Sequence, residues 1–192
     1  LSMDIRDFFG TISFRRVVGM FKSYGFEKKH AVMLAGLCCL ENKLPQGAPT
    51  SPAISNIICR RLDSRLTGLS RKHGFHYTRY ADDLIFSGDE KILRMIKVFK
   101  EIIAKEGFVP AEEKTFIRRS GARQRVLGIN VNTKVSVPRK ARRLIRAMAH
   151  KQSTEKVPDE EMIPFLLGHC AFMSAAHPEQ AGKLKKILKN LI

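Results

Sequence analysis

The chain has 192 residues, 44% of them apolar and 28% charged, which is the balance of one large globular domain or two small ones and excludes a disordered chain. No apolar run reaches the roughly 20 residues of a membrane-spanning helix, so no membrane association is expected. The 35 Lys and Arg outnumber the 18 Asp and Glu, and the net charge of +17 favours a polyanionic partner, most often nucleic acid.

Hydrophobic periodicity predicts one strand and then helices in the first third of the chain. Asp4 interrupts the apolar run of the first strand, Ser13 is expected to cap the helix after it, and Ser51 is expected to cap a longer helix. In chain order the predicted elements are a strand at 1–5, a helix after residue 13, a helix at 28–40, a stiff proline-rich loop at 44–52 and a long helix from 51 to about 69. A strand at residue 1 without an initiator Met indicates a piece of a longer protein.

The rest of the chain alternates strands and a helix, and then becomes helical. The elements are predicted at 76–80 and 84–87 for a β-hairpin, 91–105 for a helix, 114–117, 126–131 and 135–137 for strands, and 139–151, 159–176 and 178–191 for helices. Pro138 suits the first turn of a helix, and the change to helices there predicts a boundary between domains at 1–137 and 138–192.

Most of the excess positive charge lies in one segment. Residues 114–151 carry 12 Lys and Arg and no Asp or Glu, whereas residues 152–192 carry five of each sign. A segment this basic is either a solvated face or a surface that contacts phosphates, and its local concentration favours the phosphate contacts.

The cysteines and histidines predict no zinc site. The four Cys have no C-x-x-C spacing, and no His pairs with a Cys or another His at helical spacing. Buried free thiols in a reducing, cytoplasmic setting are expected instead.

Three of the seven Asp residues stand where a carboxylate is costly to bury: Asp4 within a strand, and Asp82 and Asp83 side by side in the predicted hairpin. Adjacent carboxylates repel one another unless a cation offsets their charge. Mg²⁺ takes oxygen ligands and is usually held by one or two carboxylates together with substrate phosphates, and two such ions about 4 Å apart suit nucleotidyl transfer. The alternative is a hydrated acidic turn, since Asp is common in turns.

The run Tyr80-Ala81-Asp82-Asp83 resembles the signature of reverse transcriptases of the retron and group II intron type. Five further segments resemble the same family in the expected order: Asp4 to Phe9 (first catalytic aspartate), Leu44 to Pro52 (template and nucleotide loop), Tyr77 to Arg79, Gly107-Phe108 ahead of Lys114, and Leu127 to Asn132 (primer-gripping hairpin). An ordered set of motifs is far more specific than any one motif.

Among the branches of this family, the residues around Gln46 and Tyr80 are most similar to those of bacterial retron enzymes. Retron enzymes usually have Thr where Leu127 stands. A group II intron enzyme or another bacterial defence reverse transcriptase is therefore kept as an alternative.

The resemblance implies a role for each matching residue. It implies that Asp4, Asp82, Asp83 and the carbonyl of Ile5 bind two Mg²⁺ ions, which Mn²⁺ can replace, and that Lys114 donates a proton to pyrophosphate. For the incoming nucleotide and the template, it implies that Phe9 excludes a 2′-hydroxyl and that Gln46 and Gly47 make contacts. For the primer and RNA, the implied residues are Leu127, Gly128, Arg139, Lys140, Arg142, Arg143 and Arg146.

The residue types also allow plainer interpretations. Phe9 is equally a candidate for the core, Lys114 for an ordinary surface residue, and the loop at 44–52 for a stiff connector. Arg142 and Arg143 are about 100° apart on an ideal helix, so Arg139, Arg142, Arg143 and Arg146 are not expected to share one face.

The resemblance implies an RNA-directed DNA polymerase with an α+β palm at 1–137 and an α-helical thumb at 138–192, lacking a fingers subdomain ahead of Leu1. In a retron, such an enzyme copies a dedicated structured non-coding RNA with deoxynucleotides into an RNA/DNA hybrid, and serves with an effector protein in defence against phage. The competing class is a non-catalytic RNA-binding relic of a polymerase. The intact set of three Asp argues against a relic.

Overall fold

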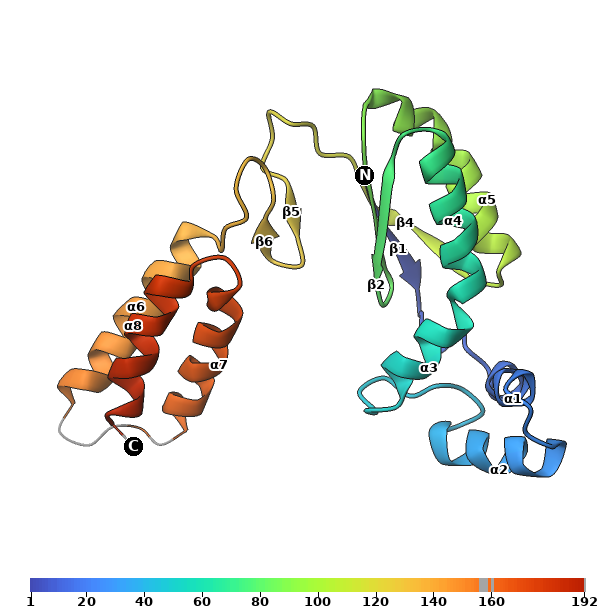
Figure 1. Ribbon diagram of the computed structural model, residues 1–192, viewed down its shortest axis with the longest axis horizontal. Helices are drawn as coiled ribbons and strands as arrows, with labels where there is room; N and C mark the ends of the chain where they lie inside the picture. The colour runs from blue at the N-terminus through green and yellow to red at the C-terminus, as the bar shows by residue number, and fades with distance from the viewer. Residues whose placement is uncertain (156–158, 160, 192) are drawn as a thin grey trace. The chain divides into compact units, whose positions relative to one another are not determined.

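The computed structural model describes residues 1–155, 159 and 161–191. The chain forms two compact units, one at Leu1–Ile117 and one that begins at Arg118, and Figure 1 shows the elements of each. The sequence predicts a boundary at 137/138 instead. Residues 118–137 belong to the second unit because their short hairpin lies against its helices: a Cβ at Gly128 would lie 3.8 Å from the ring of Phe172.

A four-stranded antiparallel sheet forms the centre of the first unit, with the order β2-β3-β1-β4. The strands are β1 (Ser2–Arg6), β2 (His76–Tyr80), β3 (Asp83–Ser87) and β4 (Val109–Phe116). The first strand and the hairpin are as predicted, but β4 begins at Val109, well before the predicted start at Lys114. Its run of charged side chains, Glu112-Glu113-Lys114, lacks the apolar alternation by which a strand is recognised.

Two of the helices of the first unit cover one face of this sheet. The helices of this unit are α1 (Phe14–Ser23), α2 (Lys28–Cys38), α3 (Ser51–Ile58), α4 (Arg60–Lys72) and α5 (Ile96–Lys105), with a 3₁₀ helix at Glu90–Met95. α4 contacts β2 and α5 contacts β4, and Figure 1 shows the two helices side by side along the sheet. Met3, Ile5, Leu84 and Phe86 point into this core. Because side chains alternate along a strand, Asp4 and Asp83 lie on the opposite face of the sheet.

Two capping predictions have different outcomes. Ser13 caps α1 as predicted, since its Oγ accepts a hydrogen bond from the Arg16 N–H. The prediction for Ser51 is wrong, because Thr50 holds the N-cap position and the Ser51 hydroxyl donates instead to the Pro45 carbonyl at 2.7 Å. That bond ties the two ends of the proline-rich loop together.

Two predicted helices are shorter in the structure. The helix expected at 28–40 ends at Cys38, and the long helix expected from Ser51 is divided at Cys59 into α3 and α4. The apolar periodicity continues across Cys59, which is why the sequence predicts one helix there.

The second unit contains a short hairpin and three helices. The strands β5 (Arg125–Val126) and β6 (Ile129–Asn130) pair, and a single bridge joins Asn130 to Ser136 in place of the strand predicted at 135–137. The helices are α6 (Arg139–Thr154), α7 (Met162–Ser174) and α8 (Pro178–Lys189), which pack around Ile145, Leu166, Cys170 and Leu184. Residue 160, within the helix predicted at 159–176, lies outside the described residues. No helix of the described ranges is long and apolar enough to cross a membrane.

Candidate active site

Strand pairing brings the three predicted aspartates to one end of the sheet. In the register of β1 and β3, Asp4 is directly opposite Asp83, and the Ile5 N–H donates to the Asp82 carbonyl at 3.1 Å. Asp82 lies in the turn between β2 and β3, just after Ala81, which has a positive φ of 50°. The chain therefore places Asp4 beside the acidic pair, although more than 70 residues separate them in sequence.

The hydrogen bonding between Ile5 and Asp82 is one-sided. In an antiparallel pair the two residues normally exchange both N–H···O bonds. Within residues 1–155 the return bond from the Asp82 N–H to the Ile5 carbonyl is absent, because the chain turns away at Ala81. The Ile5 carbonyl oxygen lies on the side of β1 that faces the acidic turn, and its lone pairs therefore remain available.

The carboxylates are close enough to influence one another. Burial raises the pKa of the Asp83 carboxyl, and repulsion from Asp82 and Asp4 raises it further, while the Lys114 ammonium opposes the shift. Asp4 itself is only 9% exposed. Concentrated negative charge in a sheltered place is costly unless positive charge is near.

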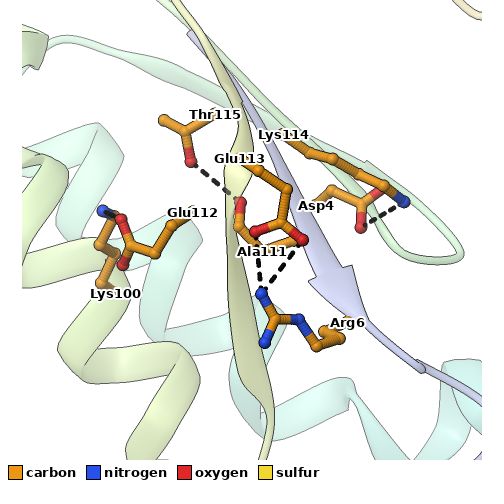
Figure 2. Close-up of polar contacts among 8 residues, drawn as sticks. All are labelled: Asp4, Arg6, Lys100, Ala111, Glu112, Glu113, Lys114 and Thr115. Carbon is orange, nitrogen blue, oxygen red and sulfur yellow. Dashed lines mark hydrogen bonds and ion pairs between the residues drawn. The ribbon is translucent and has the colours of Figure 1, made fainter.

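An irregularity in β4 brings that positive charge. Ser2 pairs with Phe116 but Asp4 pairs with Ala111, so extra residues of β4 bulge out between these two positions. The Thr115 hydroxyl donates to the Ala111 carbonyl across the bulge, and Lys114 reaches Asp4, with Nζ 3.2 Å from Oδ1 and 3.1 Å from Oδ2 (Figure 2). β-Bulges are common next to active sites because they redirect a side chain. The hydrogen bond to Asp4 raises the pKa of Lys114.

The neighbours of Lys114 on β4 point elsewhere. Figure 2 shows Glu113 in an ion pair with Arg6 of β1 and Glu112 in an ion pair with Lys100 of α5. Both acidic residues are therefore engaged away from the cluster, and Lys114 is the residue of this segment that faces Asp4.

The donor chemistry of this cluster suits Mg²⁺. Its groups are carboxylate oxygens and a backbone carbonyl, which are the ligands that this hard cation takes. Burial is the main cause of the raised pKa of Asp83, and repulsion from Asp82 and Asp4 adds to it, which a divalent cation would relieve. In the part of the chain that the structure describes, no group of three or more Asp, Glu, His or Cys side chains is arranged so that these side chains alone could hold a metal ion. Mg²⁺ commonly completes its shell with waters and substrate phosphates, so an open set of carboxylates fits the ion.

The residues predicted to contact nucleotide and template lie on two loops. Phe9 is half-buried just after β1, with its ring at 64° to that of Phe8 and 5.1 Å away, and it packs against the edge of the core. Gln46 and Gly47 are exposed in the proline-rich loop, and Gly47 has a φ of 89°, a conformation that favours glycine. Both loops belong to the first unit, and the hydrogen bond from Ser51 to the Pro45 carbonyl restrains the proline-rich loop.

The four predicted arginines do share a surface, contrary to the expectation from the helical wheel. They line one groove of about 860 Å³ between α6 and α8, together with His150, Ser153, Met173, Gln180, Lys183, Leu184 and Ile187. Residues three, four or seven positions apart lie on the same side of a helix, so Arg139, Arg142, Arg143 and Arg146 form one broad stripe along α6. The angle of about 100° between Arg142 and Arg143 places these two residues at opposite edges of that stripe. Arg142 also donates to the Val137 carbonyl and to Gln180.

The remaining predicted residues lie near this groove or on the small hairpin. Lys140 is exposed on the first turn of α6. Leu127 and Gly128 form the turn between β5 and β6, where both have positive φ, and Leu127 is 45% exposed.

Two residues to which the sequence pattern assigns no role support the acidic turn. Arg79, at the end of β2, donates to both carboxylate oxygens of Asp63 in α4 and to the Ala81 carbonyl. An arginine close to an acidic turn is the available signal, but its partner, 16 residues earlier on α4, cannot be identified without the fold.

The chain is similar in sequence to known proteins over most of its length. The family model described as reverse transcriptase (RNA-dependent DNA polymerase) matches residues 1–131. The chain is 36% identical, over 97% of its length, to the retron Mx65 reverse transcriptase of Myxococcus xanthus, and 37% identical, over 78% of its length, to the retron Ec86 reverse transcriptase of Escherichia coli. It covers 48% of each of these proteins, so it spans about half the length of the curated relatives it matches.

The fold is also similar to a solved structure of a foamy viral protease-reverse transcriptase in complex with double-stranded DNA. The TM-score is 0.50 and the identity 16%, over 99% of this chain and 34% of the viral one. At this identity the likeness concerns the fold alone.

Proposed function

The chain belongs to the reverse transcriptase family and is a homologue of retron reverse transcriptases, and we propose that it carries the polymerase active site of an RNA-directed DNA polymerase. One observation carries the proposal: Asp4, the Asp82-Asp83 pair and Lys114, from three separate parts of the sequence, meet at one end of the sheet. In this interpretation the first unit with its sheet is the palm, and the helices from Arg139 onward are the thumb.

The carboxylates of Asp4, Asp82 and Asp83 and the carbonyl of Ile5 would hold two Mg²⁺ ions, or Mn²⁺ in their place. When bound, such ions activate an attacking hydroxyl and stabilise the leaving pyrophosphate. The directly opposed positions of Asp4 and Asp83, and the Ile5 carbonyl that lacks its return bond, support this ligand set.

Lys114 is proposed to donate a proton to the leaving pyrophosphate. Its side chain is more than half exposed, so it can reach a substrate, while its hydrogen bond to Asp4 keeps it beside the metal ligands. A lysine ammonium is protonated at neutral pH, and the hydrogen bond to Asp4 raises the pKa of Lys114 further, so a proton is present beside the leaving pyrophosphate.

Phe9 is proposed to lie beneath the sugar of the incoming deoxynucleotide and to exclude a 2′-hydroxyl. Its ring is held at the edge of the core by Phe8 and is not fully enclosed there, which suits a steric gate. Gln46 and Gly47 are proposed to contact the template and nucleotide from a loop that the Ser51 bond stiffens.

The groove between α6 and α8 and the hairpin turn at Leu127 and Gly128 are proposed to bind RNA and the RNA/DNA hybrid. Five Arg and Lys side chains line the groove, and no acidic side chain lines it among the described residues. Arginines of this kind bind phosphate oxygens and fix the position of a nucleic acid, so the groove suits the backbone rather than the sequence of the partner.

The likeness to several retron enzymes supports the retron branch, and with it a dedicated structured RNA as template and a role with an effector protein in bacterial phage defence. The group II intron branch remains the alternative at this level.

Primer extension by the full-length protein tests the proposal. With an RNA template, deoxynucleotides and Mg²⁺, we expect extension products that disappear when Asp4→Asn is introduced or when a chelator is added. A wild-type protein that binds the primer–template but extends nothing under these conditions would identify a non-catalytic RNA-binding protein.

A further inference from the structure

We propose that Arg79 is a positioning residue that holds the turn carrying Asp82 and thereby sets the affinity of the site for divalent cations, with Asp63 of α4 as its anchor. This inference rests on the proposed function, since it concerns the same acidic turn. It adds two residues, Arg79 and Asp63, that lie outside the proposed set of metal ligands.

The contacts form a continuous chain from α4 to the turn. The Arg79 Nε donates to Asp63 Oδ1 at 2.8 Å, and Nη2 donates to Asp63 Oδ2 at 2.7 Å. The remaining nitrogen, Nη1, donates to the Ala81 carbonyl at 3.0 Å. One planar guanidinium therefore joins a helix to the residue directly before Asp82, with all three of its nitrogens in use.

The turn needs such support. Ala81 has a φ of 50°, in the left-handed region that residues other than glycine rarely adopt and that persists only where the surroundings hold it. β2 is an edge strand, so the turn has a neighbouring strand on one side only, and the pairing of β2 with β3 ends at Tyr80 and Asp83. Arg79 supplies a hydrogen bond at the point where the ladder stops.

Two further observations show that the pair of Arg79 and Asp63 is held in place. The side chain of Arg79 is only 5% exposed, and its guanidinium lies 5.9 Å from the centre of the Phe8 ring. Tyr77, two residues earlier on β2, donates to Asp63 Oδ1 as well, at 2.8 Å. Asp63 thus holds β2 at two points, but only the Arg79 branch continues to the turn.

Groups that orient metal ligands without touching the metal typically change metal affinity or activity by 10–100-fold when they are altered. Lysine in place of Arg79 keeps the positive charge beside Asp63 but has a single nitrogen, which cannot form the fork to Asp63 and reach the Ala81 carbonyl together. We therefore expect a looser turn and weaker metal binding in Arg79→Lys, with the nucleic-acid surfaces unaffected.

The test measures metal binding and incorporation separately in the full-length protein. Titration with Mn²⁺, followed by its electron paramagnetic resonance signal, should show at least about 10-fold weaker binding in Arg79→Lys than in the wild type. The Mg²⁺ concentration for half-maximal incorporation should rise by a similar factor, while primer–template affinity stays within about twofold. Asp63→Asn keeps one acceptor for Arg79. It should also weaken Mn²⁺ binding and raise the Mg²⁺ concentration for half-maximal incorporation, but by smaller factors than Arg79→Lys.

Tyr77→Phe is the matched control, because it removes a bond of the same length to the same Asp63 oxygen but leaves the turn contact in place. It should lower the melting temperature without changing the metal titration. If Arg79→Lys and Tyr77→Phe lower the melting temperature alike and neither weakens Mn²⁺ binding, Arg79 is merely structural and the inference is wrong. The Mn²⁺ titration gives this answer even if the wild type incorporates nothing, so failure of the proposed function is seen separately.

Discussion

Lys114 donates to both carboxylate oxygens of Asp4, at 3.2 and 3.1 Å, although 110 positions separate the two residues in sequence. The contact exists because β4 bulges between its pairings with Ser2 and with Asp4. A lysine at this point offsets part of the negative charge of the cluster and holds a proton next to the proposed metal ligands.

Replacing Lys114 by Gln should therefore lower kcat for nucleotide incorporation by about 100-fold or more, the range that general acid catalysis contributes. Lys114→Arg keeps the ion pair with Asp4 and should lie between Gln and the wild type. The measurement is single-nucleotide incorporation at saturating nucleotide and Mg²⁺. Equal kcat values in the wild type and Lys114→Gln would show that Lys114 serves only to pair with Asp4.

Phe9→Ala should admit a 2′-hydroxyl and raise ribonucleotide incorporation relative to deoxynucleotide incorporation. The informative quantity is the ratio of kcat/KM for the two nucleotides, because a general loss of activity cancels in it. Phe99→Ala serves as the control, since Phe99 is 0% exposed, stacks on Phe86 in the core, and its truncation should cost about 3–5 kcal/mol of stability without changing the ratio. A Phe9 variant that loses stability in the same way, with an unchanged ratio, would make Phe9 a core residue.

Gly10→Ala should destabilise the loop that follows β1. A Cβ at Gly10 would overlap the carboxylate of Asp7, so the exposed Asp7 side chain or the loop itself must shift. Because a side chain can give way, we expect the free energy of unfolding to fall by only about 1 kcal/mol. Gly19→Ala, in α1 with no atom within 4 Å of its Cβ, should instead raise the free energy of unfolding by about 0.5–1 kcal/mol. Chemical denaturation of the two variants gives both numbers, and equal effects would contradict the clash.

The groove between α6 and α8 is testable through salt. For every phosphate that the protein no longer neutralises, the slope of log affinity against log salt should become shallower by about 0.7–0.9. Replacing Arg139, Arg143 and Arg146 by Gln should therefore reduce the slope by about two to three units. Arg142 is left in place because it also holds Val137 and Gln180.

Lys186 and Lys189 provide the control for this experiment, since they lie on α8 but do not line the groove. Their replacement by Gln removes two positive charges and should leave the slope nearly unchanged. Equal changes per charge in the two sets of variants would indicate a general electrostatic effect and no specific groove.

Much of the fold follows from local patterns. The hairpin around Ala81, the Ser13 cap and the helical end of the chain are all predictable, because apolar periodicity and turn residues are encoded within a few positions. The start of β4 is not, because Glu112 and Glu113 satisfy their charges with Lys100 and Arg6, which are distant in sequence. The role of Ser51 escapes prediction for a similar reason, since its partner is the Pro45 carbonyl rather than the first turn of its own helix.

In the candidate site, too, some features can be predicted from local sequence patterns and others depend on contacts between distant residues. An acidic pair and an isolated Asp within an apolar strand can be recognised as costly from sequence, so their juxtaposition is predictable in outline. The ion pair of Lys114 with Asp4 and the link from Asp63 through Arg79 to Ala81 depend on a bulge and on packing between a helix and an edge strand. Neither leaves a periodic signal in the sequence.

The central claim is that the acidic turn carries out nucleotidyl transfer, and the most direct test replaces both of its carboxylates while keeping their size. In the full-length protein, Asp82→Asn combined with Asp83→Asn should abolish deoxynucleotide incorporation in a single-turnover assay, with primer–template affinity close to that of the wild type. This result is expected because the metal ligands act on the reacting phosphate, whereas the arginines of the groove contact the backbone. Incorporation at a rate near that of the wild type in the double variant would contradict the assignment of the active site.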